Sequence, residues 1–241
     1  MNRGSWKSTA KSRKGSVRPL NEDAFLNQPD AALWCVADGM GGHSKGDVAS
    51  GIIVQKLSEL IANSDELSTD SIQTAIEAAN TEIVGLSRQL KETIGSTVAV
   101  LFVADDTAHI FWAGDSRIYH FTDNKLVQVT QDHNQAGELV KYGMLTPERA
   151  KRHPGANLLT RAVGINSSLR LDHKSLAWKE SDKFILCTDG LNSVMENVAI
   201  DAHFIVTESK DWSESLINQA LDNWALDNIT AVTVHCDNAL G

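Results

Sequence analysis

The chain has 241 residues, of which 42% are hydrophobic and 22% are charged, a composition typical of a folded globular protein. Its formal net charge of −9 argues against a general binder of nucleic acids or of anionic membranes, since both ligands are themselves negatively charged. The longest apolar run, residues 98–104, is far too short to span a bilayer. We therefore expect no nucleic-acid partner and no membrane partner.

The N-terminal region is basic and contains no acidic residue before Glu22. It lacks the apolar stretch of a secretory signal, and we expect it to contain a first strand and a solvated tip. The three cysteines, Cys35, Cys187 and Cys236, each lie in an apolar run and show no disulfide or zinc spacing. Buried free thiols fit a reducing compartment, so a cytoplasmic location is expected. None of them begins a Cys-x₅-Arg stretch, which disfavours a thiolate nucleophile.

The predicted elements come in blocks of strands and helices. An apolar run from Leu33 to Asp38 predicts a buried strand, and apolar residues at helical spacing predict long helices over 48–61 and 72–90. Short apolar stretches separated by turn residues then predict four strands, at 98–103, 108–113, 117–121 and 125–130. Strands this close together pair antiparallel, because parallel neighbours need longer crossovers.

Residues 131–164 are polar with short helical pieces, and we interpret them as a mobile flap over one end of the core. The remaining elements are two strands, an irregular helical stretch, a helix and a last strand, at 169–178, 183–188, 191–206, 212–225 and 229–236. This order indicates antiparallel sheets packed with helices rather than repeated βαβ units. No internal repeat and no long linker is found, so one domain is expected over residues 1–241.

Several apolar runs end in an aspartate. Asp38 closes the first predicted strand and is followed by glycines, which let the backbone approach a bound group closely. Asp115, Asp189 and Asp227 end three further apolar runs. One Asp-Gly pair is an ordinary turn, but the recurrence indicates that these carboxylates converge. Buried carboxylates converge only when a cation neutralises them, and hard divalent cations prefer oxygen ligands. The sequence therefore predicts a site for Mg²⁺ or Mn²⁺, with more than one ion.

Six short motifs occur in the order found in one known family. They are Arg-Pro-Leu-Asn-Glu-Asp, Asp-Gly-Met-Gly-Gly-His, Gly-Ser-Thr, Gly-Asp-Ser-Arg, Asp-Gly-Leu and Asp-Asn, and they begin at Arg18, Asp38, Gly95, Gly114, Asp189 and Asp227. In them the chain resembles the metal-dependent serine/threonine protein phosphatases of the 2C (PPM) family, in their compact bacterial form. The resemblance implies an α+β fold, a four-layer αββα sandwich in which helices flank two stacked antiparallel β-sheets. It places a metal site at one end of the sandwich.

The resemblance also implies two or three Mn²⁺ or Mg²⁺ ions. The groups that would hold them are Glu22, Asp23, Asp38, Gly39, Asp115, Asp189 and Asp227. Among these, Asp38 would bridge two ions, Gly39 would contribute its backbone carbonyl, and Asp115 would bind the third ion. Asp189 and Asp227 would bind one of the two bridged ions, and Glu22 would act on the other through water, with Asp23 supporting the groups around it.

The implied reaction is hydrolysis of phosphoserine or phosphothreonine in proteins by a water activated at a dinuclear metal site, in one step and without a phosphoenzyme. Arg18 would bind the substrate phosphate and, with Asp38, would form the catalytic pair. Ser96, Thr97 and Asn228 would support the ligands without touching the metal. The expected partners are phosphorylated proteins, including a bacterial serine/threonine kinase or its targets.

The chain departs from the family pattern at two places. Met40 stands where animal members have a histidine, their proposed general acid, so the leaving group must take its proton from a metal-bound water or another residue. His43 is close in sequence but is not assigned this role. The pair His133-Asn134 replaces the His-Ser of many bacterial relatives.

The sequence features also bear on three alternative functions. A nucleotide-binding module is disfavoured because the pattern Gly39-x-Gly41-x-x-Ser44 lacks the last glycine of a dinucleotide loop. A non-catalytic relative would be expected to lose metal-site carboxylates, and none of the main ones is missing. A hydrolase of small phosphoesters stays open, because the metal site sets the reaction and not the size of the substrate.

Overall fold

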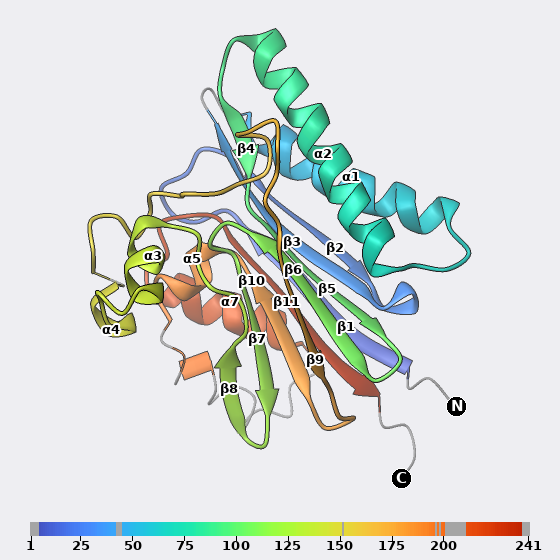
Figure 1. Cartoon of the computed structure of the whole chain (residues 1–241). Coiled ribbons are helices and arrows are strands. Elements are labelled where there is room, and N and C mark those ends of the chain that lie inside the picture. The colour runs from blue at the N-terminus through green and yellow to red at the C-terminus, as the bar shows by residue number, and fades with distance from the viewer. Residues whose placement is uncertain are drawn as a thin grey trace.

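The structure is a computed structural model and describes residues 5–41, 45–150, 152–195, 197, 199–200 and 211–237. Two antiparallel β-sheets stack face to face, and helices cover both outer faces (Figure 1). This arrangement confirms the predicted four-layer αββα sandwich. Within the described ranges, no helix combines the length and the apolar character that a bilayer crossing requires.

One sheet has six strands, in the order β2-β3-β5-β6-β9 with β4 paired to β3 beside this path. The strands are β2 (Asp23–Gln28), β3 (Leu33–Gly41), β4 (Ile94–Ser96), β5 (Val98–Ala104), β6 (Thr107–Ala113) and β9 (Asp172–Ala177). In the register of β2 and β3, Asp23 lies opposite Asp38. Two acidic residues of the predicted site are therefore neighbours across the end of this sheet.

The other sheet has five strands, in the order β1-β11-β10-β7-β8. They are β1 (Ser5–Arg13), β7 (Arg117–Thr122), β8 (Lys125–Gln128), β10 (Lys183–Cys187) and β11 (Ile229–Asp237). The first and last strands pair along their whole length, from Ser5 opposite Asp237 to Arg13 opposite Ile229. The loop after β1 and the loop before β11 consequently meet at one end of the sandwich.

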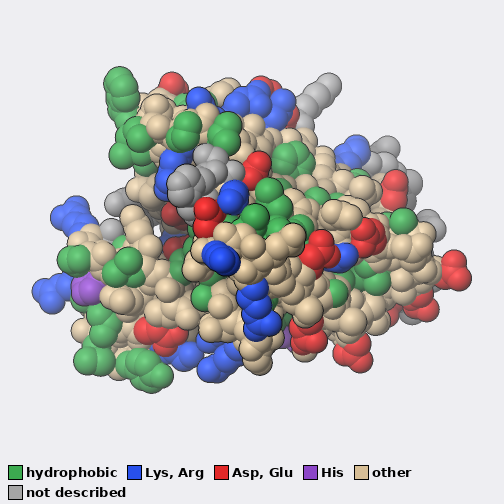
Figure 2. Space-filling view, turned by 90° about the horizontal axis from the view of Figure 1, so that it is seen from above, with side chains coloured by type: hydrophobic (Ala, Val, Ile, Leu, Met, Phe, Trp, Pro, Cys, Tyr) green, Lys and Arg blue, Asp and Glu red, His purple; other side chains and the backbone are tan. Residues whose placement is uncertain are grey.

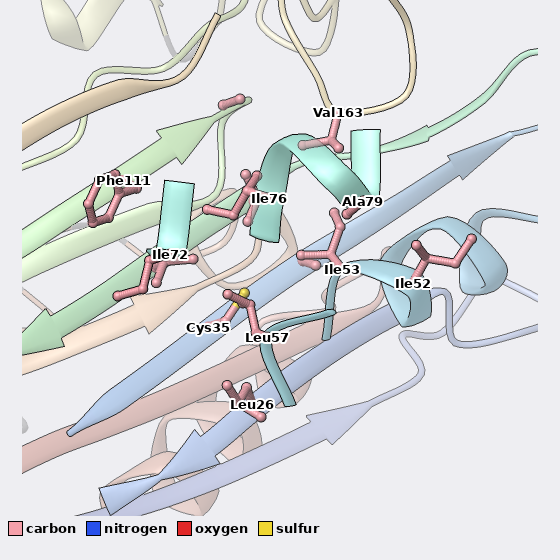
Figure 3. Close-up of a cluster of buried hydrophobic side chains, with 14 of the residues drawn as sticks. Leu26, Cys35, Ile52, Ile53, Leu57, Ile72, Ile76, Ala79, Phe111 and Val163 are labelled. Carbon is pink, nitrogen blue, oxygen red and sulfur yellow. The ribbon is translucent and has the colours of Figure 1, made fainter. Parts of the chain in front are cut away.

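The strand β3 shows why the part of a central strand that lies between two covered faces is apolar. Leu33 and Cys35 face the helices, where Cys35 lies among helix side chains such as Leu57 and Ile53 (Figure 3). Trp34, which alternates with them, is buried between the two sheets. Successive side chains point to opposite faces of a sheet, and here both faces are covered, so each position from Leu33 to Ala37 is apolar.

The helices α1 (Gly46–Asn63) and α2 (Thr69–Leu90) confirm the two predicted long helices and cover the six-stranded sheet. The side chain of Ser68 starts α2 by accepting a hydrogen bond from the Ser71 N–H. On the opposite face, α5 (Asp189–Asn192) and α7 (Trp212–Asp222) cover the five-stranded sheet, and a short 3₁₀ helix, η1 (Pro29–Ala31), joins β2 to β3.

Some boundaries differ from the prediction. The helix predicted over 212–225 ends at Asp222, because Trp224 adopts a left-handed backbone with φ 59°. The strand predicted over 125–130 ends at Gln128. The predicted flap, residues 131–164, contains α3 (Gln135–Lys141) and α4 (Pro147–Ala150) and lies beside α5 at one end of the sandwich (Figure 1).

His43 and the last part of the predicted irregular stretch, residues 201–206, lie outside the described residues.

Candidate metal and phosphate site

A cavity of about 560 Å³ opens at the end of the sandwich where the predicted motifs meet. Acidic side chains from five separate parts of the chain line it: Glu22, Asp38, Asp115, Asp189 and Asp227. Arg18, Gly39, Met40, Thr97 and Asn228 also line it, together with residues of the 131–164 segment. Seen from above, acidic side chains lie in a hollow of the surface that basic and hydrophobic side chains border (Figure 2).

Asp38 is fixed by the backbone and hydroxyl groups around the end of β3. Its N–H donates to Thr97 Oγ1 at 3.0 Å, and its carbonyl accepts from the Thr97 N–H at 2.9 Å and from Ser96 Oγ at 2.9 Å. These bonds use only main-chain atoms of Asp38, so its carboxylate is left to face the cavity. Ser96 and Thr97 thus lie where supporting residues were predicted.

Gly39 is packed against the first turn of α1. A Cβ atom at this position would lie 2.0 Å from the carbonyl oxygen of Gly46, so no larger residue fits. Its N–H donates to the Glu22 carbonyl at 3.1 Å, which joins the motif at Arg18 to the motif at Asp38.

Glu22 is oriented by the N-terminus of α1. Its Oε1 accepts from the Gly46 N–H at 2.8 Å, and its backbone N–H donates to Asn228 Oδ1 at 2.9 Å. A carboxylate at a helix N-terminus is stabilised by the unpaired N–H groups of the first turn. Asn228 also donates through Nδ2 to the Leu20 carbonyl at 2.9 Å, so it ties the Glu22 loop to the start of β11.

Asp23 lies behind the cavity and does not line it. Its Oδ2 accepts from Thr188 Oγ1 at 2.8 Å and from Thr230 Oγ1 at 2.6 Å, while its buried Oδ1 has no hydrogen-bond partner among the described residues. Burial raises the pKa of Asp23 to about 7, although both hydroxyl bonds act in the opposite direction. The two threonines were not predicted.

Burial and neighbouring carboxylates raise the pKa values of Asp38, Asp115 and Asp189. Burial raises the pKa of Asp115 to about 7 and that of Asp189 to about 6, and in each case a neighbouring aspartate charge adds to the effect. Burial and then the charge of Asp23 raise the pKa of Asp38 well above its usual range. Ionising all of these groups at neutral pH therefore requires a positive charge among them.

The donor set fits divalent metal ions. Asp189 Oδ1 is buried without a hydrogen-bond partner in the described structure, and the charge of Asp189 is among the causes that raise the pKa of Asp38. A hard cation would neutralise these carboxylates and would satisfy the lone pairs of an all-oxygen site. Among the described residues, however, no three His, Cys, Asp or Glu side chains are grouped closely enough to hold one metal ion as they stand. Two of the carboxylates have other partners: Asp23 accepts from the threonines, and Asp227 accepts from Arg18.

Arg18 faces Asp227 across the two loops that meet at this end. Its Nε and Nη2 donate to the two carboxylate oxygens of Asp227 at 2.8 Å each, and its side chain is half exposed. The loops are held together by the Ser16 N–H, which donates to the Ala225 carbonyl, and by the Val17 N–H, which donates to the Leu226 carbonyl. The carboxylate that Arg18 contacts is thus that of Asp227, a residue of another predicted motif.

The 131–164 segment is connected to the acidic groups by polar contacts that sequence reasoning missed. Asn134 Nδ2 donates to Asp115 Oδ2 at 3.4 Å, and His133 Nδ1 accepts from the Gly114 N–H at 3.2 Å. Asp172 forms an ion pair with Arg161, a residue that lines the cavity, and also contacts His133. The only signal in the sequence was the pair His133-Asn134, which departs from the His-Ser of many bacterial relatives.

An acidic all-oxygen cavity beside an exposed guanidinium suits metal-assisted hydrolysis of phosphate esters, which is the chemistry of metal-dependent phosphatases. Comparison with known proteins identifies the family within this class of enzymes. Residues 11–225 match the family described as protein phosphatase 2C. The chain therefore belongs to the protein phosphatase 2C family.

Bacterial serine/threonine phosphatases are similar over the whole described fold. The chain is 32% identical over 237 residues to the serine/threonine phosphatase stp of Listeria monocytogenes, covering 93% of each chain. The structure of PppA, described as a key regulatory component of T6SS in Pseudomonas aeruginosa, is 33% identical with a TM-score of 0.86 and covers 96% of this chain and 98% of that one. The catalytic domain of PstP in complex with two manganese ions is 28% identical with a TM-score of 0.86, over 95% and 97% of the two chains.

These comparisons confirm four predictions from the sequence: the family, the sandwich fold, the enzyme class of serine/threonine protein phosphatase, and the dependence on Mn²⁺ or Mg²⁺. The roles of individual residues in the site remain predictions.

Proposed function

We propose that this phosphatase binds the phosphate of phosphoserine and phosphothreonine residues through Arg18 and holds its metal ions through the carboxylates around Asp38. The observation that carries this assignment is the convergence in one cavity of an exposed guanidinium with buried carboxylates whose pKa values are raised. We assign Asp38, Asp189 and Asp227, with the Gly39 carbonyl, to direct metal binding. Glu22, which is held at the N-terminus of α1, is assigned to the metal ions from that side, and Asp115 is assigned to a third ion. Asp23 is assigned a supporting role behind the cavity, where Thr188 and Thr230 hold its carboxylate.

The bound ions supply charge neutralisation and an ionised water at neutral pH, which makes a protein nucleophile unnecessary. The protein's own groups hold the acidic side chains in position. Ser96 and Thr97 hold the Asp38 backbone, and Asn228 holds both the Glu22 loop and the strand that follows Asp227, so the acidic side chains keep fixed positions. Such fixed positions are what lets a site stabilise developing charge without rearrangement.

In this structure Asp227 occupies the guanidinium of Arg18 that is proposed to bind the phosphate. The bidentate contact with Asp227 has the geometry that a guanidinium also uses for two phosphate oxygens. Asp227 would be among the groups that hold a metal ion, and the Arg18 guanidinium would then be available to the substrate phosphate. Arg18 would thus orient the phosphate at the cavity that it lines.

The 131–164 segment supplies the other wall of the cavity through Gln135 and residues 157–162. We assign to this segment the role of a mobile cover over the bound phosphopeptide, and we assign residues 1–241 to one catalytic domain. Its attachment through Asn134 and through the Asp172–Arg161 pair supports a hinge at both ends rather than a free loop.

The substrates are phosphorylated proteins, and the enzyme opposes a serine/threonine kinase in the cytoplasm. The buried free cysteines support the reducing compartment. The similarity to PppA supports a role in kinase-controlled signalling or secretion in a bacterium. A hydrolase of small phosphoesters is the remaining competitor, and phosphopeptide turnover far above sugar-phosphate or nucleotide turnover would exclude it.

The deciding experiment is phosphate release from a phosphothreonine peptide by metal-stripped protein, with and without Mn²⁺ or Mg²⁺, beside the variant Asp38→Ala. We expect release that requires metal and is lost in the variant, whose circular-dichroism spectrum stays that of the parent. Near-normal turnover in Asp38→Ala would overturn the site assignment.

A further inference from the structure

Trp224 occupies a backbone position that glycine normally takes. It follows α7 in a left-handed conformation with φ 59°, its N–H donates to the Leu221 carbonyl, and the next N–H, of Ala225, donates to the Ala220 carbonyl. These two bonds define the helix-ending turn in which glycine is favoured because a Cβ is strained there. A bulky residue at such a position is a conformational outlier.

The Trp224 side chain gains no burial in return for this strain, since it is 79% exposed. Leaving so large an apolar ring in water forgoes the burial that normally stabilises tryptophan. Among the residues that the structure describes, its only compensation is the helix end itself, which glycine or asparagine would form with less strain. The ring is therefore positioned for something outside the chain.

Three other exposed apolar side chains surround the same two loops. Val17 is 67% exposed, Leu20 is 46% exposed and Leu226 is 61% exposed. The hydrogen bonds from the Ser16 and Val17 N–H groups to residues 225 and 226 hold the two loops side by side. We call Val17, Leu20, Trp224 and Leu226 the apolar rim. Exposed apolar side chains gathered in this way mark surfaces that bind a partner.

The apolar rim is continuous with the phosphate-binding place. Val17 precedes Arg18 in the chain, Leu226 precedes Asp227, and the Arg18 guanidinium is bonded to the Asp227 carboxylate. A phosphorylated residue held at Arg18 has its flanking residues spaced by about 3.4 Å each along an extended chain. Two to four flanking residues therefore extend roughly 7–14 Å from the phosphate, and the rim begins at the residues next to Arg18 and Asp227.

Two basic side chains beside the rim limit which flanking residues the rim can accept. Arg13 and Lys14 are exposed at the end of β1, and Lys14 Nζ donates to the Pro19 carbonyl at 3.4 Å. Basic flanking residues would be repelled here, and polar ones would gain nothing from the four apolar side chains. The surface fits an apolar side chain.

Building on the proposed function of Arg18, we infer that the apolar rim docks an apolar side chain that flanks the phosphorylated serine or threonine of the protein substrate. Trp224 is the principal contact, and the rim sets substrate preference without taking part in the chemistry.

The test uses the Mn²⁺-loaded enzyme and three substrates. Two are phosphothreonine peptides that differ only in carrying leucine or glutamine at the flanking positions, and the third is p-nitrophenyl phosphate, which has no flanking residues. The variant is Trp224→Asn, because asparagine tolerates the left-handed backbone. The matched control is Val127→Asn, which alters an exposed valine on β8 away from the rim.

We expect Trp224→Asn to lower kcat/KM for the leucine peptide by roughly tenfold, which is the scale of one lost apolar contact, and to leave p-nitrophenyl phosphate unchanged. The preference of the parent enzyme for leucine over glutamine should shrink to match, and Val127→Asn should behave like the parent. An equal loss on both peptides, a loss on p-nitrophenyl phosphate, or no change at all would overturn the inference. If the parent enzyme hydrolyses p-nitrophenyl phosphate only with metal but neither peptide, the proposed protein substrate fails instead, and the inference fails with it.

Discussion

Arg18 and Asp227 are separated by 209 positions in the chain and form a two-point contact in which both donor–acceptor distances are 2.8 Å. The contact closes the cavity at the place where the first and last strands meet. The contact pairs a proposed metal ligand, Asp227, with the proposed phosphate ligand, Arg18. These proposed roles predict that metal binding and phosphate binding are coupled, because each would draw one member of the pair away from the other.

Replacing Arg18 by alanine should raise KM more than it lowers kcat. Arg18 lies half exposed at the mouth of the cavity and forms no contact that the described fold depends on apart from Asp227. We expect a roughly tenfold higher KM for a phosphothreonine peptide, because one charge-assisted bidentate contact with phosphate is lost. Steady-state kinetics would check this, and a large loss in kcat with an unchanged KM would contradict the role in binding.

Replacing Asp38 by asparagine should make the metal-free protein more stable while it abolishes catalysis. The substitution removes one ionisable group from a buried set that repels itself, and the main-chain bonds to Thr97 and Ser96 are kept. Calorimetry at pH 8 should give a higher Tm for metal-free Asp38→Asn than for the metal-free parent. Mn²⁺ should raise the Tm of the parent far more than that of the variant, and the opposite order would exclude Asp38 as the central ligand.

The stability of the metal-free protein should fall as pH rises from about 4 to about 7. Burial raises the pKa of Asp23 and Asp115 from 3.8 to about 7 and that of Asp189 to about 6, so the folded state binds more protons than the unfolded state in this window. The stabilisation from these groups is complete below pH 4 and is lost as pH passes through the folded pKa values. Urea unfolding across this range, with Mn²⁺ added in a second series, should show the decline without metal and its suppression with metal.

The variant Thr230→Val should weaken metal binding through Asp23. Thr230 Oγ1 donates to Asp23 Oδ2, and without it the buried carboxylate loses one of the two bonds that favour its charged form. We expect the free energy of unfolding to fall by about 1–3 kcal/mol and the Mn²⁺ affinity to fall with it. Thr233→Val is the matched control on the same strand, since in the described structure the Thr233 hydroxyl bonds only to Thr9 Oγ1. Equal losses of Mn²⁺ affinity in both variants would show a general effect of the strand.

Periodicity and short motifs predicted much of this fold. The apolar faces of 48–61 and 72–90 were sufficient to predict α1 and α2, and the apolar run before Asp38 predicted β3, because both signals are local. The convergence of Asp38, Asp115, Asp189 and Asp227 also followed, since each ends an apolar run and so leaves the core near its edge.

Other features depend on contacts between distant segments and leave no local signal. The pairing of Arg18 with Asp227 and the position of Thr188 and Thr230 behind Asp23 arise only when β1, β2, β10 and β11 are brought together. The end of α7 was placed too late because Trp224 is an unusual residue for the left-handed turn that stops it. The Asp172–Arg161 pair was missed because neither residue belongs to a recognised motif.

The pairing of β1 with β11 also has a consequence for biosynthesis. The site draws on residues from Arg18 to Asp227, and its two loops are aligned only after the last strand has inserted between β1 and β10. Contacts of such long sequence separation form late, because their loop-closure entropy must be overcome first. A nascent chain on the ribosome therefore holds nearly every acidic residue of the site yet has no phosphatase activity until β11 has emerged.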